Sequence, residues 1–192
     1  MAAAKVFAQK GYDRATVREI SEELNISSGL IYYYIGAKSD IVSLMLSEGE
    51  RLWEDFFEKN PADLERNSAT EVLCHTIEDY MVRNDRYRHF MRFWYRELRY
   101  APRDVQQVVL GWNAKLVDTF EKILAEGYAR GEFRTYVNVA VSHMIVIYGE
   151  AWALKPWLLR KHFTLEEYIK GLIQMVVKVL GVDEKTIKAG LI

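Results

Sequence analysis

The spacing of hydrophobic residues predicts helices along almost the whole chain. Apolar side chains recur every three or four residues, which is the period of one helix face. Only three prolines interrupt the 192 residues, and half of the residues are hydrophobic. The pattern therefore predicts an all-α protein with a sizeable core. The longer predicted helices cover residues 1–9, 16–24, 28–35, 38–59, 65–83, 137–159 and 164–180, together with a helix that opens at Pro102.

The most specific local pattern is a pair of short helices early in the chain. Thr16 and Glu19 have the spacing of a capping box, which marks the start of the first helix. Asn25 can adopt the left-handed conformation that ends this helix. Ser27 or Ser28 can then cap the second helix. Two short helices joined by a tight turn predict a helix-turn-helix.

The second helix of this pair carries three consecutive tyrosines, Tyr32, Tyr33 and Tyr34. Consecutive residues on a helix point about 100° apart, so all three rings cannot enter the core of a small domain. At least one ring must face outward, either as a plain exposed aromatic or as a group that reaches phosphates and base edges. Lys38 lies in the first turn of the next helix, where a cation opposes the helix dipole unless a phosphate binds there. The alternative is an exposed lysine without a partner.

The segment Val6–Leu46 resembles the DNA-binding domain of the TetR family of transcriptional repressors. The matching stretches are VFAQKGY, TVREIS and LNISSGLIYYYIGAKSDI. The resemblance implies a three-helix helix-turn-helix domain over residues 1–46. It also implies a C-terminal helical bundle for ligand binding and dimerisation over residues 47–192. Ala37 departs from the family, which usually has a capping serine or asparagine there.

The resemblance also implies DNA-contacting positions. Matched residue by residue, they are Thr16, Arg18, Ser28, Gly29, Tyr32, Tyr33, Tyr34 and Lys38. Arg18 is the candidate for reading a guanine edge. Gly29 can only allow close approach, and Thr16 is expected to act through its cap and a backbone phosphate. The implied partner is double-stranded DNA with a pseudo-palindromic operator.

Charge leaves a second function open. The net charge is −1, and the five basic and five acidic residues between Met1 and Leu46 cancel. DNA affinity would therefore depend on the placement of charges and not on an overall positive field. The first helix is also short for this family. The alternative is a helical ligand-binding or interaction protein that retains the helix-turn-helix only as a scaffold.

Aromatic residues gather between positions 87 and 100. Tyr87, Met91, Trp94 and Leu98 form one helical stripe, and a row of arginines forms another. These stripes are either core and solvated surface, or the wall and mouth of a pocket for an apolar ligand with an anionic group. The candidate ligand-binding residues are Tyr87, Met91, Trp94, Arg96, Trp112, Tyr148 and Trp152. The stretch EAWALKPWLLRKHFTLEEY resembles family members that sense fatty acyl-CoA, which implies a fatty acyl-CoA effector. A cationic aromatic drug is the next candidate.

The last two long helices carry broad apolar faces. In this family such helices pair between two subunits, which implies a homodimer. Charging Val176 on the last helix would then separate the subunits. The alternative is that both helices only cover the protein's own core. His143, in the preceding helix, is expected to be a hydrogen-bonded core histidine.

The sequence offers no pattern for catalysis or for a cofactor. Cys74 and His75 are adjacent, so on a helix their side chains diverge. The four histidines lack metal-ligand spacing, and no glycine-rich phosphate loop is present. We expect neither an enzyme nor a metal site. A lone cysteine suits the reducing cytoplasm, and the longest apolar run is interrupted by polar residues, so no membrane span is expected.

Overall fold

The protein is a bundle of α-helices, as the hydrophobic spacing predicts. The computed structural model describes residues 2–135 and 139–182, with the side chains of residues 60–63 outside this description. The helices are α1 (Ala2–Lys10), α2 (Val17–Leu24), α3 (Ser28–Tyr34), α4 (Lys38–Ala62), α5 (Ala69–Arg86), α6 (Arg88–Glu97), α7 (Arg103–Ala129), α8 (Val139–Leu154), α9 (Pro156–Leu159) and α10 (Leu165–Leu180). Two 3₁₀ turns, η1 (Asp63–Glu65) and η2 (Leu98–Tyr100), follow α4 and α6.

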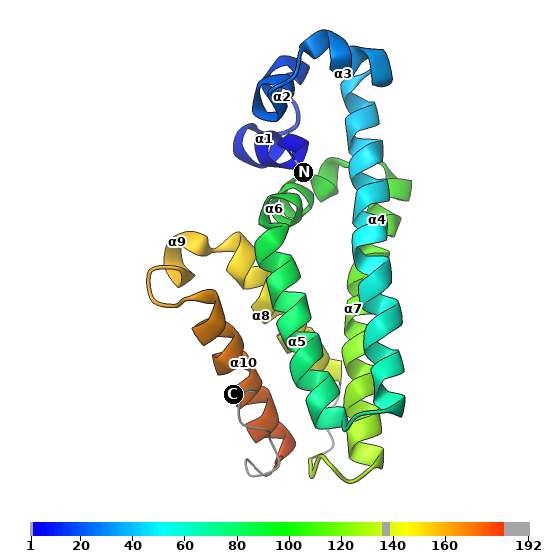
Figure 1. Cartoon of the computed structure of the whole chain (residues 1–192), viewed down its shortest axis with the longest axis vertical. Helices are drawn as coiled ribbons and strands as arrows, with labels where there is room; N and C mark the ends of the chain where they lie inside the picture. The colour runs from blue at the N-terminus through cyan, green and yellow to red at the C-terminus, as the bar shows by residue number, and fades with distance from the viewer. Residues whose placement is uncertain (1, 136–138, 183–192) are drawn as a thin grey trace.

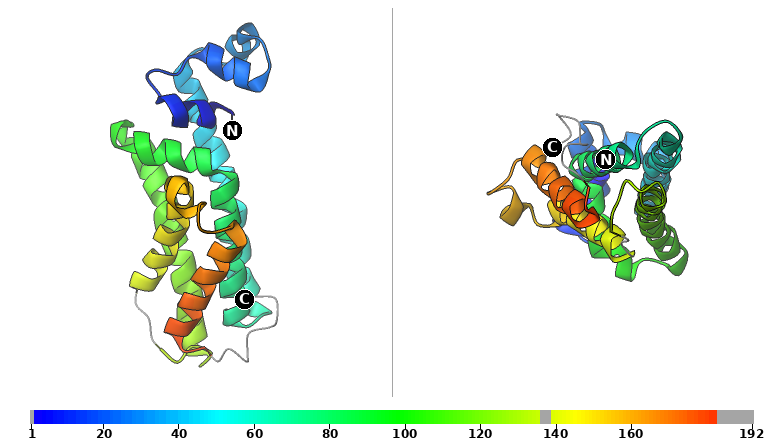
Figure 2. Two further views of the ribbon diagram at one scale, coloured as in Figure 1. Left: turned by 90° about the vertical axis from the view of Figure 1, so that its left-hand side faces the viewer. Right: turned by 90° about the horizontal axis from the view of Figure 1, so that it is seen from below.

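Helices α1–α3 lie together at one end of an elongated molecule (Figure 1). The long helix α4 leaves this end and runs beside α7 into the larger bundle. Helix α10 lies on one flank of that bundle, and α4 and α7 lie on the opposite flank (Figure 2). No helix in the described part of the chain is long and apolar enough to cross a membrane.

Local capping residues define the first helices as predicted. Thr16 Oγ1 accepts from the Glu19 N–H, and a Glu19 carboxylate oxygen accepts from the Thr16 N–H at 2.9 Å. Asn25 ends α2 in the left-handed region with φ of 56°. Ser27 caps α3 by accepting from the Leu30 N–H at 3.2 Å. The predicted helix-turn-helix is therefore confirmed, with Ser27 and not Ser28 as the cap.

Helix α4 starts at Lys38 although Ala37 offers no capping side chain. Asp40 compensates, because its carboxylate accepts from the Ala37 N–H at 2.9 Å. The helix predicted over residues 38–59 extends further, since α4 runs through Pro61 to Ala62. A proline in the last turn removes one backbone hydrogen bond but leaves the preceding turns intact. The helix also crosses the predicted domain boundary at residue 46 without a break.

The predicted helix over residues 137–159 is interrupted near its end. Its first two residues lie outside the described part of the chain, and α8 ends at Leu154. Lys155 has φ of −121° and ψ of 46°, and α9 begins at Pro156. The break has a steric cause, because a proline disfavours the helical region for the residue before it. As a result, α9 and the turn after it bring Arg160 back over α8.

Helix α10 covers the protein's own core with the face that was expected to bind a second subunit. Val176 is 0% exposed, so charging it would disrupt folding and not only an interface. His143 was also misplaced, because it is exposed while its neighbour Ser142 is buried. Apolar periodicity correctly identified the buried face of α10. It could not determine whether this face packs on the same chain or on a second subunit.

At two glycines, an aromatic ring packs directly against the helix backbone in the core. A Cβ atom on Gly149 would lie 2.2 Å from Tyr80 Cε1, and one on Gly127 would lie 2.0 Å from the Phe133 ring. Tyr80 cannot give way easily, because it is fully buried and its hydroxyl donates to the Val146 carbonyl at 2.8 Å.

We expect Gly149→Ala to lower the free energy of unfolding by about 1–3 kcal/mol through overpacking. Gly111→Ala is the matched control, because a Cβ there meets nothing within 4 Å. It should raise stability by up to about 1 kcal/mol through helix propensity. Urea denaturation followed by circular dichroism measures both changes. Equal stability of the two variants would contradict the packing described for Gly149.

Candidate DNA-binding surface and ligand cavity

Helix α3 exposes all three of its tyrosines. Tyr33 is the most open, at 81% exposed, and Tyr32 and Tyr34 are also exposed. The rings of Tyr33 and Tyr34 meet edge to face with centroids 5.1 Å apart. Only Ile31 of this helix is buried, and it attaches α3 to the small core of α1–α3. The result is a short helix with an unusually aromatic outer surface.

Two serines hold α3 against α2. The Ser21 hydroxyl donates to the Arg18 carbonyl at 2.6 Å, and its oxygen lies 2.8 Å from the Ser28 hydroxyl. Since Ser21 has already used its only hydrogen, Ser28 is the donor of the second bond. Ser28 is therefore half-buried and engaged with α2, while Gly29 beside it is exposed.

Arg18 and Thr16 lie at the start of α2. The Arg18 side chain is 82% exposed, and its Nε atom lies 3.0 Å from a Glu22 carboxylate oxygen. Such exposed ion pairs contribute little, so this guanidinium can exchange its partner readily. Thr16 acts as the helix cap described above.

Lys38 is engaged with the backbone of the loop after α1. Its ammonium donates to three backbone carbonyls, those of Tyr12 at 2.7 Å, Asp13 at 3.2 Å and Ala15 at 3.2 Å. It also lies over the Tyr12 ring, 4.4 Å from the centroid. An ammonium has three donors, and all three are occupied within the protein. Lys38 thus ties the start of α4 to the loop after α1, so it is not the exposed lysine without a partner that the sequence left as the alternative.

Glu19 links α1 to α2 through charge. Its carboxylate accepts from Lys10 Nζ at 2.5 Å and from the Thr16 backbone. The hydrogen bond from Lys10 and then that from Thr16 lower the pKa of Glu19 to about 2. Because the folded pKa lies below the ordinary value of 4.5, the stabilising contribution is complete above that value and is lost as pH falls toward about 2.

We therefore expect the Glu19 carboxyl to titrate near pH 2 when followed by NMR. Lys10→Met should raise this midpoint, because it removes the largest cause of the shift. A wild-type midpoint near 4.5 would show that the ion pair does not form in solution.

A cavity of about 80 Å³ lies between α4, α6, α7 and α8, and we call it the ligand cavity. Its wall is mainly apolar, with aromatic and aliphatic side chains, and polar groups reach it from α6, α7 and α8. The residues that line it are Trp53, Phe90, Met91, Trp94, Tyr95, Leu98, Val109, Trp112, Asn113, Leu116, Glu150 and Leu154. Three of the predicted ligand-binding residues, Met91, Trp94 and Trp112, line this cavity. Glu150 was not predicted, because a single acidic residue in an apolar helix forms no recognisable sequence pattern.

The other four predicted ligand residues do not line this cavity. Tyr148 stacks on Tyr168 of α10 with centroids 4.2 Å apart, and Trp152 packs on the same ring. Arg96 pairs with Glu97 at 3.3 Å and lies beside Gly11, the residue that follows α1. Tyr87 is half-buried at the junction of α5 and α6. Helical spacing predicted the helix face on which each of these residues lies. It could not predict which other helix that face packs against.

Three arginines gather where α5, α6 and α8 meet, and we call Arg88, Arg92 and Arg160 the arginine cluster. Arg92 Nε donates to the Ala153 carbonyl at 2.6 Å, and Arg160 Nη2 lies 2.5 Å from an Asp85 carboxylate oxygen. Burial, then the charges of Arg160 and Arg88, lower the pKa of Arg92. Mutual repulsion of this kind favours an anion beside the cluster.

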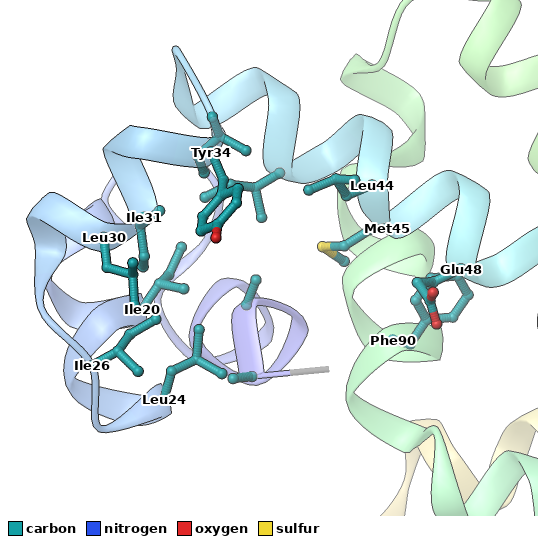
Figure 3. Close-up of a pocket in the computed structure, with 14 residues that line it drawn as sticks. Ile20, Leu24, Ile26, Leu30, Ile31, Tyr34, Leu44, Met45, Glu48 and Phe90 are labelled. Carbon is teal, nitrogen blue, oxygen red and sulfur yellow. The ribbon is translucent and has the colours of Figure 1, made fainter.

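A larger groove of about 340 Å³ is lined by residues of α1–α3, α4 and α6 (Figure 3). Leu44 on α4 lines this groove and is 56% exposed. Tyr34 points over this groove although it is exposed, whereas Tyr32 and Tyr33 do not line the groove. Phe90 lines both the groove and the ligand cavity, and Phe93 on α6 packs on Phe7 of α1 with centroids 5.3 Å apart. Helix α6 therefore contacts both the ligand cavity and the DNA-binding end.

Comparisons with known proteins agree with this arrangement. The family model described as bacterial regulatory proteins, tetR family, matches residues 1–45, and a tetracyclin repressor-like C-terminal domain matches residues 66–158. The HTH-type transcriptional regulator HbdR of Aromatoleum sp. (strain CIB) is 30% identical over 190 residues, which cover 98% of this chain and 82% of HbdR.

Solved structures with the same fold include two that hold coenzyme A thioesters. One is FadR from Bacillus subtilis in complex with stearoyl-CoA, with a TM-score of 0.67 and 21% identity over 93% of this chain and 95% of that one. The other is AibR in complex with isovaleryl coenzyme A and operator DNA, with a TM-score of 0.71 and 16% identity over 91% and 93% of the two chains.

Proposed function

Because this chain belongs to the TetR family of bacterial regulatory proteins, we propose that it is a homodimeric repressor which a coenzyme A thioester releases from operator DNA. The observation that carries the proposal is the position of α6. One face of α6 lines the ligand cavity, and the other packs on α1 at the DNA-binding end. The proposed activity is binding and not catalysis, and it needs no cofactor.

In the proposed complex, α3 enters the major groove. Tyr32 and Tyr33 reach phosphates and base edges, Gly29 allows the backbone to approach, and Arg18 reads a guanine. Two copies of α3 in successive grooves would lie roughly 34 Å apart, so a small change in their separation breaks register with a pseudo-palindrome. The domain division at residue 46 and the cytoplasmic location remain predictions.

The proposed dimer uses the exposed sides of α8 and α10. Five large apolar side chains face outward there although both helices also cover the core. They are Val139, Met144, Ile147, Met175 and Val179. Pairing these sides between two copies would bury them in a four-helix interface.

The effector class is supported by the cavity, by the arginine cluster and by the thioesters held in FadR and AibR. The acyl group would enter the ligand cavity, and the phosphates would meet the arginine cluster. A volume of about 80 Å³ is well below the roughly 300–1,000 Å³ of typical ligand pockets, so it suits a short acyl group better than a long fatty chain. We therefore favour a short acyl-CoA over the fatty acyl-CoA that the sequence resemblance implied.

The test measures fluorescence anisotropy on DNA from the protein's own upstream region. We expect binding that falls steeply with salt and a weakening of about 5–150-fold by a short acyl-CoA, the usual range of allosteric coupling. Arg92→Gln should remove the acyl-CoA effect, while Arg51→Gln on the exposed side of α4 should leave it unchanged.

Two outcomes would contradict different parts of the proposal. The absence of salt-dependent DNA binding would favour the alternative function, a ligand-binding or interaction protein with the helix-turn-helix as scaffold. DNA binding that no coenzyme A thioester alters would reject the effector class and favour a cationic aromatic ligand.

A further inference from the structure

We propose that Glu150, Asn113 and Trp94 select an effector whose enclosed part carries a hydroxyl group. The coenzyme A portion of this effector rests on the proposed function, whereas the hydroxyl selection rests on the ligand cavity alone. The three side chains come from three different helices and meet in one otherwise apolar wall.

Two of these polar groups, those of Trp94 and Glu150, are buried at a cost in the cavity wall. The Trp94 indole is almost fully buried, and its N–H has no hydrogen-bond partner in the described part of the chain. Glu150 shares a hydrogen bond with Asn113, while burial raises the pKa of its carboxyl. Burying a donor without a partner, or a carboxylate among aromatic rings, costs stability. A ligand that completes these hydrogen bonds would offset that cost.

A hydroxyl group matches this set better than other substituents. It can donate to a Glu150 oxygen and at the same time accept from the Trp94 N–H or the Asn113 amide. A plain alkyl group would leave the indole donor unpaired. An ammonium could satisfy Glu150, but Arg92 donates to the carbonyl of Ala153, one helical turn further along α8, and the arginine cluster would repel a cation there.

The direct test uses phenol and toluene, which have the same size and differ by a hydroxyl in place of a methyl group. Calorimetry should give phenol about tenfold tighter binding, corresponding to one hydrogen bond of about 1.4 kcal/mol. The ¹⁵N-labelled Trp94 indole N–H signal, assigned with Trp94→Phe, should shift with phenol and report the site. Glu150→Leu should abolish the preference, Glu150→Gln should retain much of it, and the exposed control Glu166→Leu should leave it unchanged.

Several results would overturn the selection. They are equal or tighter binding of toluene, a preference that Glu150→Leu does not change, or no binding of either compound. Tighter binding of benzylamine than of phenol would replace the hydroxyl with an ion pair to Glu150.

A second pair of compounds, two coenzyme A thioesters, tests the hydroxyl selection separately from the proposed function. Racemic 3-hydroxybutyryl-CoA should release operator DNA at about tenfold lower concentration than butyryl-CoA. If neither thioester acts while phenol is still preferred, the effector class is wrong and the hydroxyl selection stands. If both thioesters act equally and Glu150→Leu changes neither response, the effector class stands and the selection is wrong.

Discussion

Replacing Ile147 with glutamate is expected to yield a folded monomer that no longer binds a two-fold operator. Ile147 is 61% exposed on α8, so a carboxylate there remains hydrated in the monomer. In the proposed four-helix interface the same charge would be buried without a partner, which strongly opposes association. Loss of the second DNA-binding unit should weaken operator binding by a factor of about 10²–10⁴. Sedimentation velocity and anisotropy on the operator measure the two effects.

Two control variants make this result specific. Val108→Glu changes another exposed apolar residue, on α7, and should leave the dimer intact. Val176→Glu should instead unfold the chain, because Val176 is fully buried within its own subunit. An intact dimer for Ile147→Glu would place the interface on another surface.

The second large effect concerns Tyr33, whose replacement by alanine should weaken operator binding by about 1–3 kcal/mol for each half-site. The ring is exposed and packs edge to face on its exposed neighbour Tyr34, so folding should not change. Tyr33→Phe distinguishes the contribution of the hydroxyl group to operator binding from that of the ring. Tyr100→Ala is the control, since Tyr100 is equally exposed but lies in η2, remote in sequence from α3.

Lys38→Ala should behave differently from Tyr33→Ala. Both would reduce DNA binding, but the lysine variant should also lower thermal stability, because it removes three hydrogen bonds to backbone carbonyls. Unchanged DNA binding for Tyr33→Ala, with the dimer intact, would show that α3 does not enter the groove as proposed.

Features governed by near neighbours in the chain were predictable from the sequence. The start of α2 depends on Thr16 and Glu19, three residues apart, and its end on Asn25, so hydrogen bonds within a few residues define it. Helix geometry alone required at least one outward tyrosine on α3, and the structure exposes all three. The all-α class followed in the same way from the spacing of apolar residues.

Features that depend on which distant segments meet were decided only by the tertiary structure. Lys38 reaches carbonyls more than 20 residues earlier, and no local pattern could assign that partner. Trp94, Asn113 and Glu150 surround one cavity because three helices converge there, while Tyr148 and Trp152 turn to α10 instead. Periodicity determines the face on which a side chain lies. Packing between helices determines what that face contacts, since it depends on the volumes and crossings of segments far apart in the chain.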